Sequence, residues 1–132
     1  MTETTYKILQ PSHCNLCGGR VHLVSNGVIY GREYGSGKVY LCEQCESYVG
    51  THKNSPLDAM GLLANKRMRL LKQECHRIFD KQWSTRSERT NLYRWLSMQM
   101  GISTEMCHFG WFDEDKLKKA LNILRKEFVE PQ

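Results

Sequence analysis

Hydrophobic positions in the first fifty residues occur in short runs, separated by polar and glycine-rich segments. The runs at residues 21–24, 28–30 and 38–41 are rich in β-branched and aromatic side chains, which favours strands. Asn26-Gly27 lies between the first two runs and predicts a hairpin turn, because both residues tolerate the positive φ angles of such a turn. We therefore expect a small antiparallel sheet, with strands too short to be stable alone.

After residue 55 the apolar positions recur every three or four residues, a spacing typical of amphipathic helices. Ser55 and Asp58 match a capping box, with Pro56 at the first helical position. Thr85 with Glu88 forms a second capping box. The helices that this pattern predicts span residues 55–82, 86–100 and 113–128.

Two C-x2-C pairs, Cys14 with Cys17 and Cys42 with Cys45, carry the strongest chemical signal. Each pair can offer two thiolates from one tight turn, and two such turns complete the tetrahedral shell of one Zn²⁺ ion. Four thiolate ligands leave no open coordination position, so the predicted ion is structural rather than catalytic. Zinc binding by such sites releases about 10–16 kcal/mol in small peptides, enough to hold the predicted strands. Redox dithiols are the alternative, although thioredoxin-like chemistry places one pair in a βαβ setting.

These elements predict an α+β fold, with a small N-terminal antiparallel β zinc ribbon packed on a C-terminal three-helix unit. The predicted zinc ribbon covers residues 1–54, and the basic helical unit covers residues 55–132. A length of 132 residues, 40% of them hydrophobic and 25% charged, suits one ordinary domain or two small ones.

Several features of the sequence indicate the cellular compartment. The chain has no apolar run of about 18 residues, which excludes a membrane-spanning helix. Residues 1–10 lack the apolar region of a secretory signal. Six cysteines without such a signal are typical of thiols or metal ligands in a reducing compartment. We therefore expect a cytoplasmic protein with no membrane partner and no organic cofactor.

The formal net charge of +5 is concentrated in the middle of the chain, where residues 51–100 hold ten basic and four acidic side chains. A localised excess of this kind attracts polyanions, which makes nucleic acid the favoured partner. An ordinary solvated helix face is the alternative. The candidate nucleic-acid-binding residues are Lys66, Arg67, Arg69, Arg77 and Lys81 along the predicted long helix, with Arg32 and Lys38 in a glycine-rich turn of the ribbon.

Histidines and one carboxylate provide an alternative site. His76 and Asp80 stand four residues apart on the predicted helix, His52 precedes that helix, and His108 follows Cys107 in a connector. If they converged, they could form a second metal site or an acid/base cluster of a metal-dependent nuclease. The alternative is that each histidine caps a helix or forms a hydrogen bond to a buried carbonyl group in a non-catalytic protein. We favour this second interpretation.

Other chemistry-bearing residues are expected to serve packing. Cys75 falls on an apolar stripe and is expected in the core. Cys107 could act as a nucleophile, but we favour packing in the core or at the junction of the two modules. The ribbon tyrosines could stack on unpaired bases, but we favour a miniature core with hydroxyl groups at the surface. These residues are Tyr30, Tyr34, Tyr40 and Tyr48.

Several motifs resemble those of a known family. They include the two cysteine turns, residues 30–35, residues 48–53 and the segment 107–110. With these motifs the chain resembles a bacterial and phage-encoded zinc-ribbon family, labelled "zinc-finger-containing" and of unknown function. The resemblance covers nearly the whole chain. It implies a zinc ribbon joined to helices and a setting in phage or mobile elements, and it implies no particular activity.

The sequence thus favours a non-catalytic protein that holds one structural zinc ion and binds nucleic acid through a basic helix face. A protein-binding adaptor or inhibitor of a host protein is the first alternative, with the same basic face turned to an acidic protein partner. A metal-dependent nuclease is the second.

Overall fold

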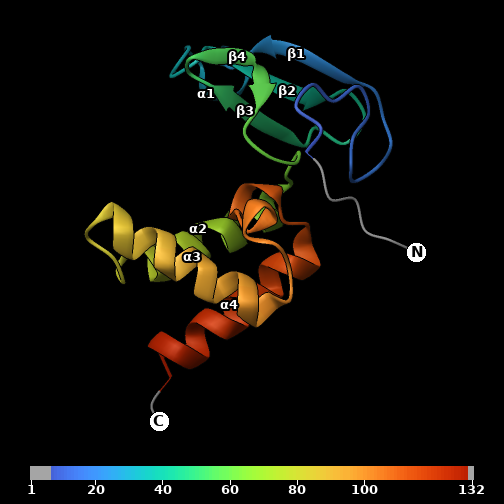
Figure 1. Ribbon diagram of the computed structural model, residues 1–132. Coiled ribbons are helices and arrows are strands. Elements are labelled where there is room, and N and C mark those ends of the chain that lie inside the picture. The colour runs from blue at the N-terminus through green and yellow to red at the C-terminus, as the bar shows by residue number, and fades with distance from the viewer. Residues whose placement is uncertain (1–6, 131–132) are drawn as a thin grey trace. The chain divides into compact units, whose positions relative to one another are not determined.

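The computed structural model describes residues 7–130 and divides into two compact units, one ending at Lys66 and the other beginning at Arg67. Unit 1 is a four-stranded antiparallel sheet and unit 2 is helical, so the predicted α+β class is confirmed (Figure 1). The strands are β1 (Val21–Ser25), β2 (Lys38–Cys42), β3 (Tyr48–His52) and β4 (Ser55–Ala59), hydrogen-bonded in that order.

The predicted hairpin at Asn26-Gly27 is wrong. Residues 28–30 belong to a short helix, α1 (Gly27–Tyr30), and β1 pairs instead with β2. The Asn26 side chain explains the difference: its oxygen accepts the N–H of Tyr34 at 3.1 Å and its amide nitrogen donates to the Tyr34 carbonyl at 2.7 Å. Asn26 therefore closes a longer connection between β1 and β2 rather than a two-residue turn.

The predicted helix over residues 55–82 is shorter in the structure. Its first residues form β4, and the helix α2 runs from Lys66–Asp80. Backbone hydrogen bonds to β3 outweigh the local preference for a helix start at Ser55. The N–H of Met60 donates to the carbonyl of Gly50, and Ala64 and Tyr48 exchange two backbone hydrogen bonds. Pro56, which has no N–H to donate, fits the outer strand of a sheet. The sheet unit consequently extends well beyond residue 54.

Unit 2 holds α2, α3 (Arg86–Met100) and α4 (Glu114–Phe128), with two short 3-10 turns, Thr104–Met106 and Phe109–Trp111, between α3 and α4 (Figure 1). The capping box of Thr85 and Glu88 is present at the start of α3. Phe79 and Phe109, each at most 1% exposed, lie at the centre of the core with ring centroids 5.4 Å apart. Among the described residues, no helix is both long and apolar enough to cross a membrane.

Candidate metal centre

The β1–β2 ladder brings the two cysteine turns to one end of the sheet. The first turn directly precedes β1 and the second follows β2, and the register pairs Val21 with Cys42. A further bond from the N–H of Glu43 to the carbonyl of Arg20, at 2.9 Å, extends this pairing to the turns. Because β1 and β2 are antiparallel, the start of β1 lies beside the end of β2. The two cysteine turns therefore lie next to each other at that end of the strand pair.

The four sulfur atoms lie at the spacing of a tetrahedral zinc site. All four Sγ atoms are within 4.8 Å of one another, with Cys14 and Cys45 3.7 Å apart and Cys17 and Cys42 3.5 Å apart. Ligands at about 2.3 Å from a tetrahedral zinc ion stand about 3.8 Å apart. The cluster therefore fits one Zn²⁺ ion held by Cys14, Cys17, Cys42 and Cys45.

Backbone N–H groups donate hydrogen bonds to the sulfur atoms and so favour their thiolate form. Leu16 donates to Cys14 at 3.3 Å, and Gly19 donates to Cys17 at 3.4 Å. Cys42 accepts from Gln44 and Cys45 at 3.4 and 3.5 Å. Such bonds stabilise the anionic form of a ligand, which is the form that binds a metal ion.

The pKa values of the thiols differ because their surroundings differ. The Ser47 hydroxyl, followed by its backbone N–H, lowers the pKa of Cys45 to about 6. Hydrogen bonds from the N–H groups of Cys45 and Gln44 lower the pKa of Cys42 in spite of its burial. Burial raises the pKa of Cys14. One turn therefore favours thiolates by itself, and the other depends more on the charge of the bound ion.

Left-handed backbone follows the second cysteine of each turn. Gly18 has φ 78°, and Glu46, at the equivalent place after Cys45, has φ 65° although it is not glycine. Gly19 serves a different purpose, because a Cβ there would lie 2.8 Å from Gln44 and 3.0 Å from the Cys42 sulfur. The close approach of the two turns therefore requires glycine at position 19.

The metal centre is part of the core of unit 1. Cys14 and Cys42 are buried among Val21, Tyr40, Val49, Ala59 and Leu63, whereas Cys17 and Cys45 reach the surface. Asn15, inside the first turn, makes two hydrogen bonds to the backbone of Leu63, at 2.9 and 3.0 Å. An ion held by these cysteines would stand where the strands and the segment after β4 meet, which is the place of a structural ion rather than an exposed catalytic one.

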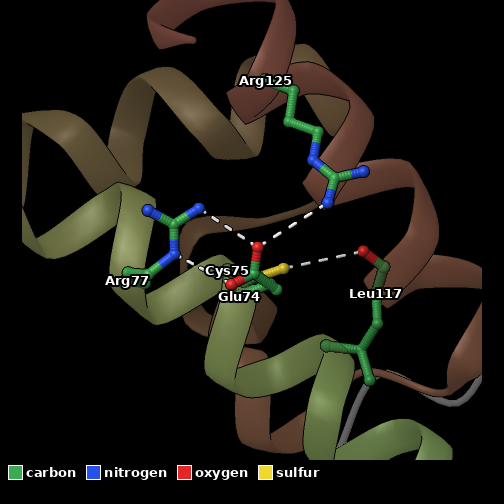
Figure 2. Close-up of polar contacts among 5 residues, drawn as sticks. All are labelled: Glu74, Cys75, Arg77, Leu117 and Arg125. Carbon is green, nitrogen blue, oxygen red and sulfur yellow. Dashed lines mark hydrogen bonds and ion pairs between the residues drawn. The ribbon is translucent and has the colours of Figure 1, made fainter.

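The two other cysteines lie in the core of unit 2, as expected. Both are fully buried, and the Cys75 sulfur lies 3.7 Å from the carbonyl oxygen of Leu117 on α4 (Figure 2). Burial raises the pKa of Cys75 to about 12 and that of Cys107 to about 11. At pH 8, therefore, roughly one in a thousand of these thiols or fewer is ionised.

Thiol counting with Ellman's reagent is expected to separate the two classes of cysteine. After chelation in native buffer at pH 8, four thiols should react rapidly, and all six should react only in denaturant. In the double variant Cys75→Ala/Cys107→Ala the native count should stay at four and the denatured count should fall to four. Six rapid thiols in the chelated, undenatured protein would contradict this assignment.

The proposed histidine cluster is brought together only in part. His76 and Asp80 meet on α2, with Nδ1 3.9 Å from the carboxylate oxygen. The ring of His76 packs edge-on against Phe109 at 4.9 Å, and the ring of His108 packs against Tyr93 at 5.4 Å. Within residues 7–130, however, the four cysteines are the one group of three or more metal-binding side chains at ligating distances.

The surroundings of these histidines differ. Burial lowers the pKa of His76, with further lowering by Lys72 and Arg89, and the nearby Asp80 only partly opposes this. The His76 side chain is nevertheless about half exposed, at 49%. His52 is exposed at the end of β3 in unit 1.

The predicted basic residues lie at the surface, exposed or half-buried. Arg32 is in the connection between α1 and β2, and Lys38 is the first residue of β2. Lys66, Arg67, Arg69 and Arg77 lie on α2, and Lys81 follows its last residue.

Tertiary structure adds one basic residue that sequence reasoning missed and changes the interpretation of two tyrosines. Arg125 of α4 joins the charges of α2, because Glu74 lies between the guanidinium groups of Arg77, at 2.8 Å, and Arg125, at 3.7 Å (Figure 2). The expectation that the ribbon tyrosines form a core is correct for Tyr40, which is buried, and wrong for Tyr30 and Tyr34, which are about half exposed. The sequence pattern of α4 places Arg125 in the last turn, but it does not predict that Arg125 pairs with Glu74 of α2.

Comparison with known proteins agrees with this metal centre. A family described as a zinc-finger-containing domain matches residues 10–127, which is most of the chain and includes all four cysteines. Neither a curated protein nor a solved structure matches the chain. With one zinc site built from paired cysteine turns, the chain belongs to this family of zinc-finger-containing domains.

Proposed function

We propose that this protein binds nucleic acid without catalysing a reaction on it. The contact would be made by a surface of α2 that we call the α2 basic surface, and the zinc centre would hold unit 1 folded. The α2 basic surface consists of Lys66, Arg67, Arg69, Arg77 and Lys81.

The first turn of α2 is the observation that carries this proposal. Lys66, Arg67 and Arg69 stand there, and this turn contains no acidic residue. The N-terminus of a helix already carries a partial positive charge, so three basic side chains there oppose the helix dipole. An anion such as a phosphate group is favoured at this place by the side chains, the dipole and the N–H groups of the turn.

The ion pairs of Arg67 and Arg77 lie at the protein surface. Arg67 is 3.6 Å from Glu114, and Arg77 is 2.8 Å from Glu74. The four side chains are 30–71% exposed, and surface pairs of this type contribute about 0–1 kcal/mol. Phosphate oxygens can therefore replace these carboxylates at little cost, and Arg125, which also pairs with Glu74, adds a further cation.

Phosphate contacts by such side chains position a nucleic acid without reading its sequence. The non-catalytic part of the proposal is supported by the cysteine-only ligand set of the metal centre, which leaves no coordination position for a substrate. A phage or mobile-element setting, which the family resemblance implies, is compatible with this function and forms part of the proposal.

Salt dependence of binding is the direct test. Fluorescence anisotropy with labelled DNA and RNA, both single-stranded and duplex, should show affinity that falls steeply with added salt. The double variant Lys66→Gln/Arg69→Gln should lower the slope of log K against log salt by about 1.8 on duplex DNA, because each lost phosphate contact contributes about 0.9.

A matched control removes the same charge elsewhere. Lys53 lies in the turn between β3 and β4, and Arg94 lies exposed on α3. The variant Lys53→Gln/Arg94→Gln has the same net charge as the test variant and should keep the wild-type slope. Equal losses in both variants would show a response to net charge alone, and no binding of any nucleic acid at low salt would refute the proposed function.

A further inference from the structure

Two aromatic side chains are exposed together on unit 1. Tyr30 is 51% exposed and Tyr34 is 49% exposed, and their ring centroids lie 5.9 Å apart in an edge-to-face arrangement. Tyr30 also meets Tyr48 of β3 at 6.4 Å. A small domain gains most from burying such large rings, so exposed neighbouring rings are an informative departure from that rule.

Hydrogen bonds from Asn26 hold the backbone segment that carries these two rings. Asn26, only 6% exposed, makes the two hydrogen bonds to the backbone of Tyr34 and donates its own N–H to Gly37 at 2.9 Å. Gly31 and Gly37 take the left-handed conformation that the bends of this connection need, with φ 83° and 82°. The backbone beneath the tyrosine rings is thus held in place, which reduces the entropy lost on binding a ligand.

Positive charge accompanies the rings. The guanidinium group of Arg32 lies over the ring of Tyr34, 4.8 Å from its centroid, and its Nε donates to the Tyr34 hydroxyl at 2.8 Å. Lys38 is exposed at the end of the same connection. Glu33, the one acidic residue between Asn26 and Lys38, accepts a hydrogen bond from Ser25 at 2.6 Å, which ties its carboxylate to β1.

We infer that Tyr30, Arg32 and Tyr34 form a stacking platform for unpaired bases of single-stranded nucleic acid. The half-exposed ring of Tyr34, with Tyr30 beside it, would stack on a base, and Arg32 and Lys38 would neutralise the adjoining phosphates. This inference rests on the proposed function and adds its substrate class, since the α2 basic surface alone would not distinguish single strands from duplexes.

The chemistry of the platform favours single strands. Stacking requires the flat face of a base, and a duplex covers those faces with neighbouring base pairs. A duplex could use only the charges of Arg32 and Lys38. Stacking is also tolerant of sequence, because every base has a π-face.

The test compares binding of three probes to the full-length, zinc-loaded protein: labelled oligothymidylate, the same backbone with abasic sites, and a duplex of equal length. Wild-type protein should bind oligothymidylate about 5- to 150-fold more tightly than the abasic strand, the range expected for one stacked base. Tyr34→Leu, which keeps apolar bulk without a π-face, should lower this preference by about fivefold or more, the share of one stacked base, and leave duplex affinity unchanged. Tyr34→Phe should keep the preference within twofold.

Controls separate this inference from folding and from the proposed function. Leu57→Ala removes a side chain that is 56% exposed on β4 and should change no affinity. Every variant should retain one zinc ion and the wild-type amide NMR spectrum away from the substitution. Salt-dependent binding in which Tyr34→Leu has no effect, or weakens single strands and duplexes equally, would overturn the platform and leave the proposed function standing. Binding of none of the probes would overturn both.

Discussion

Chelation of the zinc ion is expected to unfold unit 1 while the helices of unit 2 persist. The strands of unit 1 are five residues long, and two of the four cysteines belong to its buried core. Zinc binding by such a site releases about 10–16 kcal/mol, which exceeds what a sheet of this size retains on its own. Protons compete with zinc for the thiolates, so the ion should be lost as the pH falls rather than as it rises.

Amide NMR and metal analysis measure this effect together. On addition of a strong chelator, one zinc ion per chain should be released and the dispersed signals of β1–β4 should collapse, whereas far-UV circular dichroism should keep its helical signal. Cys42→Ser should reproduce the loss, and Cys75→Ser, at a buried cysteine outside the cluster, should retain the ion. A dispersed sheet spectrum in metal-free protein would contradict the structural role of zinc.

Truncation of Phe79 is expected to have the second-largest effect and to act on unit 2. This side chain is fully buried on α2, with ring centroids 4.3 Å from Tyr93 and 5.4 Å from Phe109. Phe79→Ala should lower the free energy of unfolding of unit 2 by about 3–5 kcal/mol, because the lost aromatic burial leaves a cavity. A domain of this size has only about 5–15 kcal/mol of stability, so the variant is expected to be marginal.

Urea denaturation followed by helical circular dichroism gives the measurement. Leu70→Ala is the matched control, since Leu70 lies on the same helix but is 52% exposed, and it should change stability by less than about 1 kcal/mol. Zinc content should be unchanged in both variants. Equal effects of the two substitutions would show that α2 does not bury Phe79 as described.

The metal centre was predictable from the sequence because its signal is local. Each C-x2-C pair forms a ligating turn by itself, and glycine after Cys17 is visible in the printed sequence. The helices α3 and α4 were predictable for the same reason, since their caps, Thr85 and Asp113, act within one turn of the residues they stabilise.

The errors arose where a distant partner outweighed a local preference. Ser55, Pro56 and Asp58 resemble a helix start, yet bonds from this segment to β3 place them in a strand. Asn26-Gly27 resembles a hairpin turn, yet the Asn26 side chain finds the backbone of Tyr34 eight residues away. Local preferences amount to about 1 kcal/mol or less per residue, so a few hydrogen bonds and buried contacts can reverse them.

By itself, then, the sequence determined the ligands of the zinc ion, the α+β class, the two final helices and the concentration of positive charge in residues 51–100. Only the tertiary structure decided that residues 55–59 complete the sheet, that Arg125 joins the charges of α2 through Glu74, and that Tyr30 and Tyr34 remain exposed beside Arg32. The physical reason is range: coordination turns and caps are formed by neighbours in the chain, whereas strand partners, ion pairs between helices and exposure depend on residues that meet only after folding.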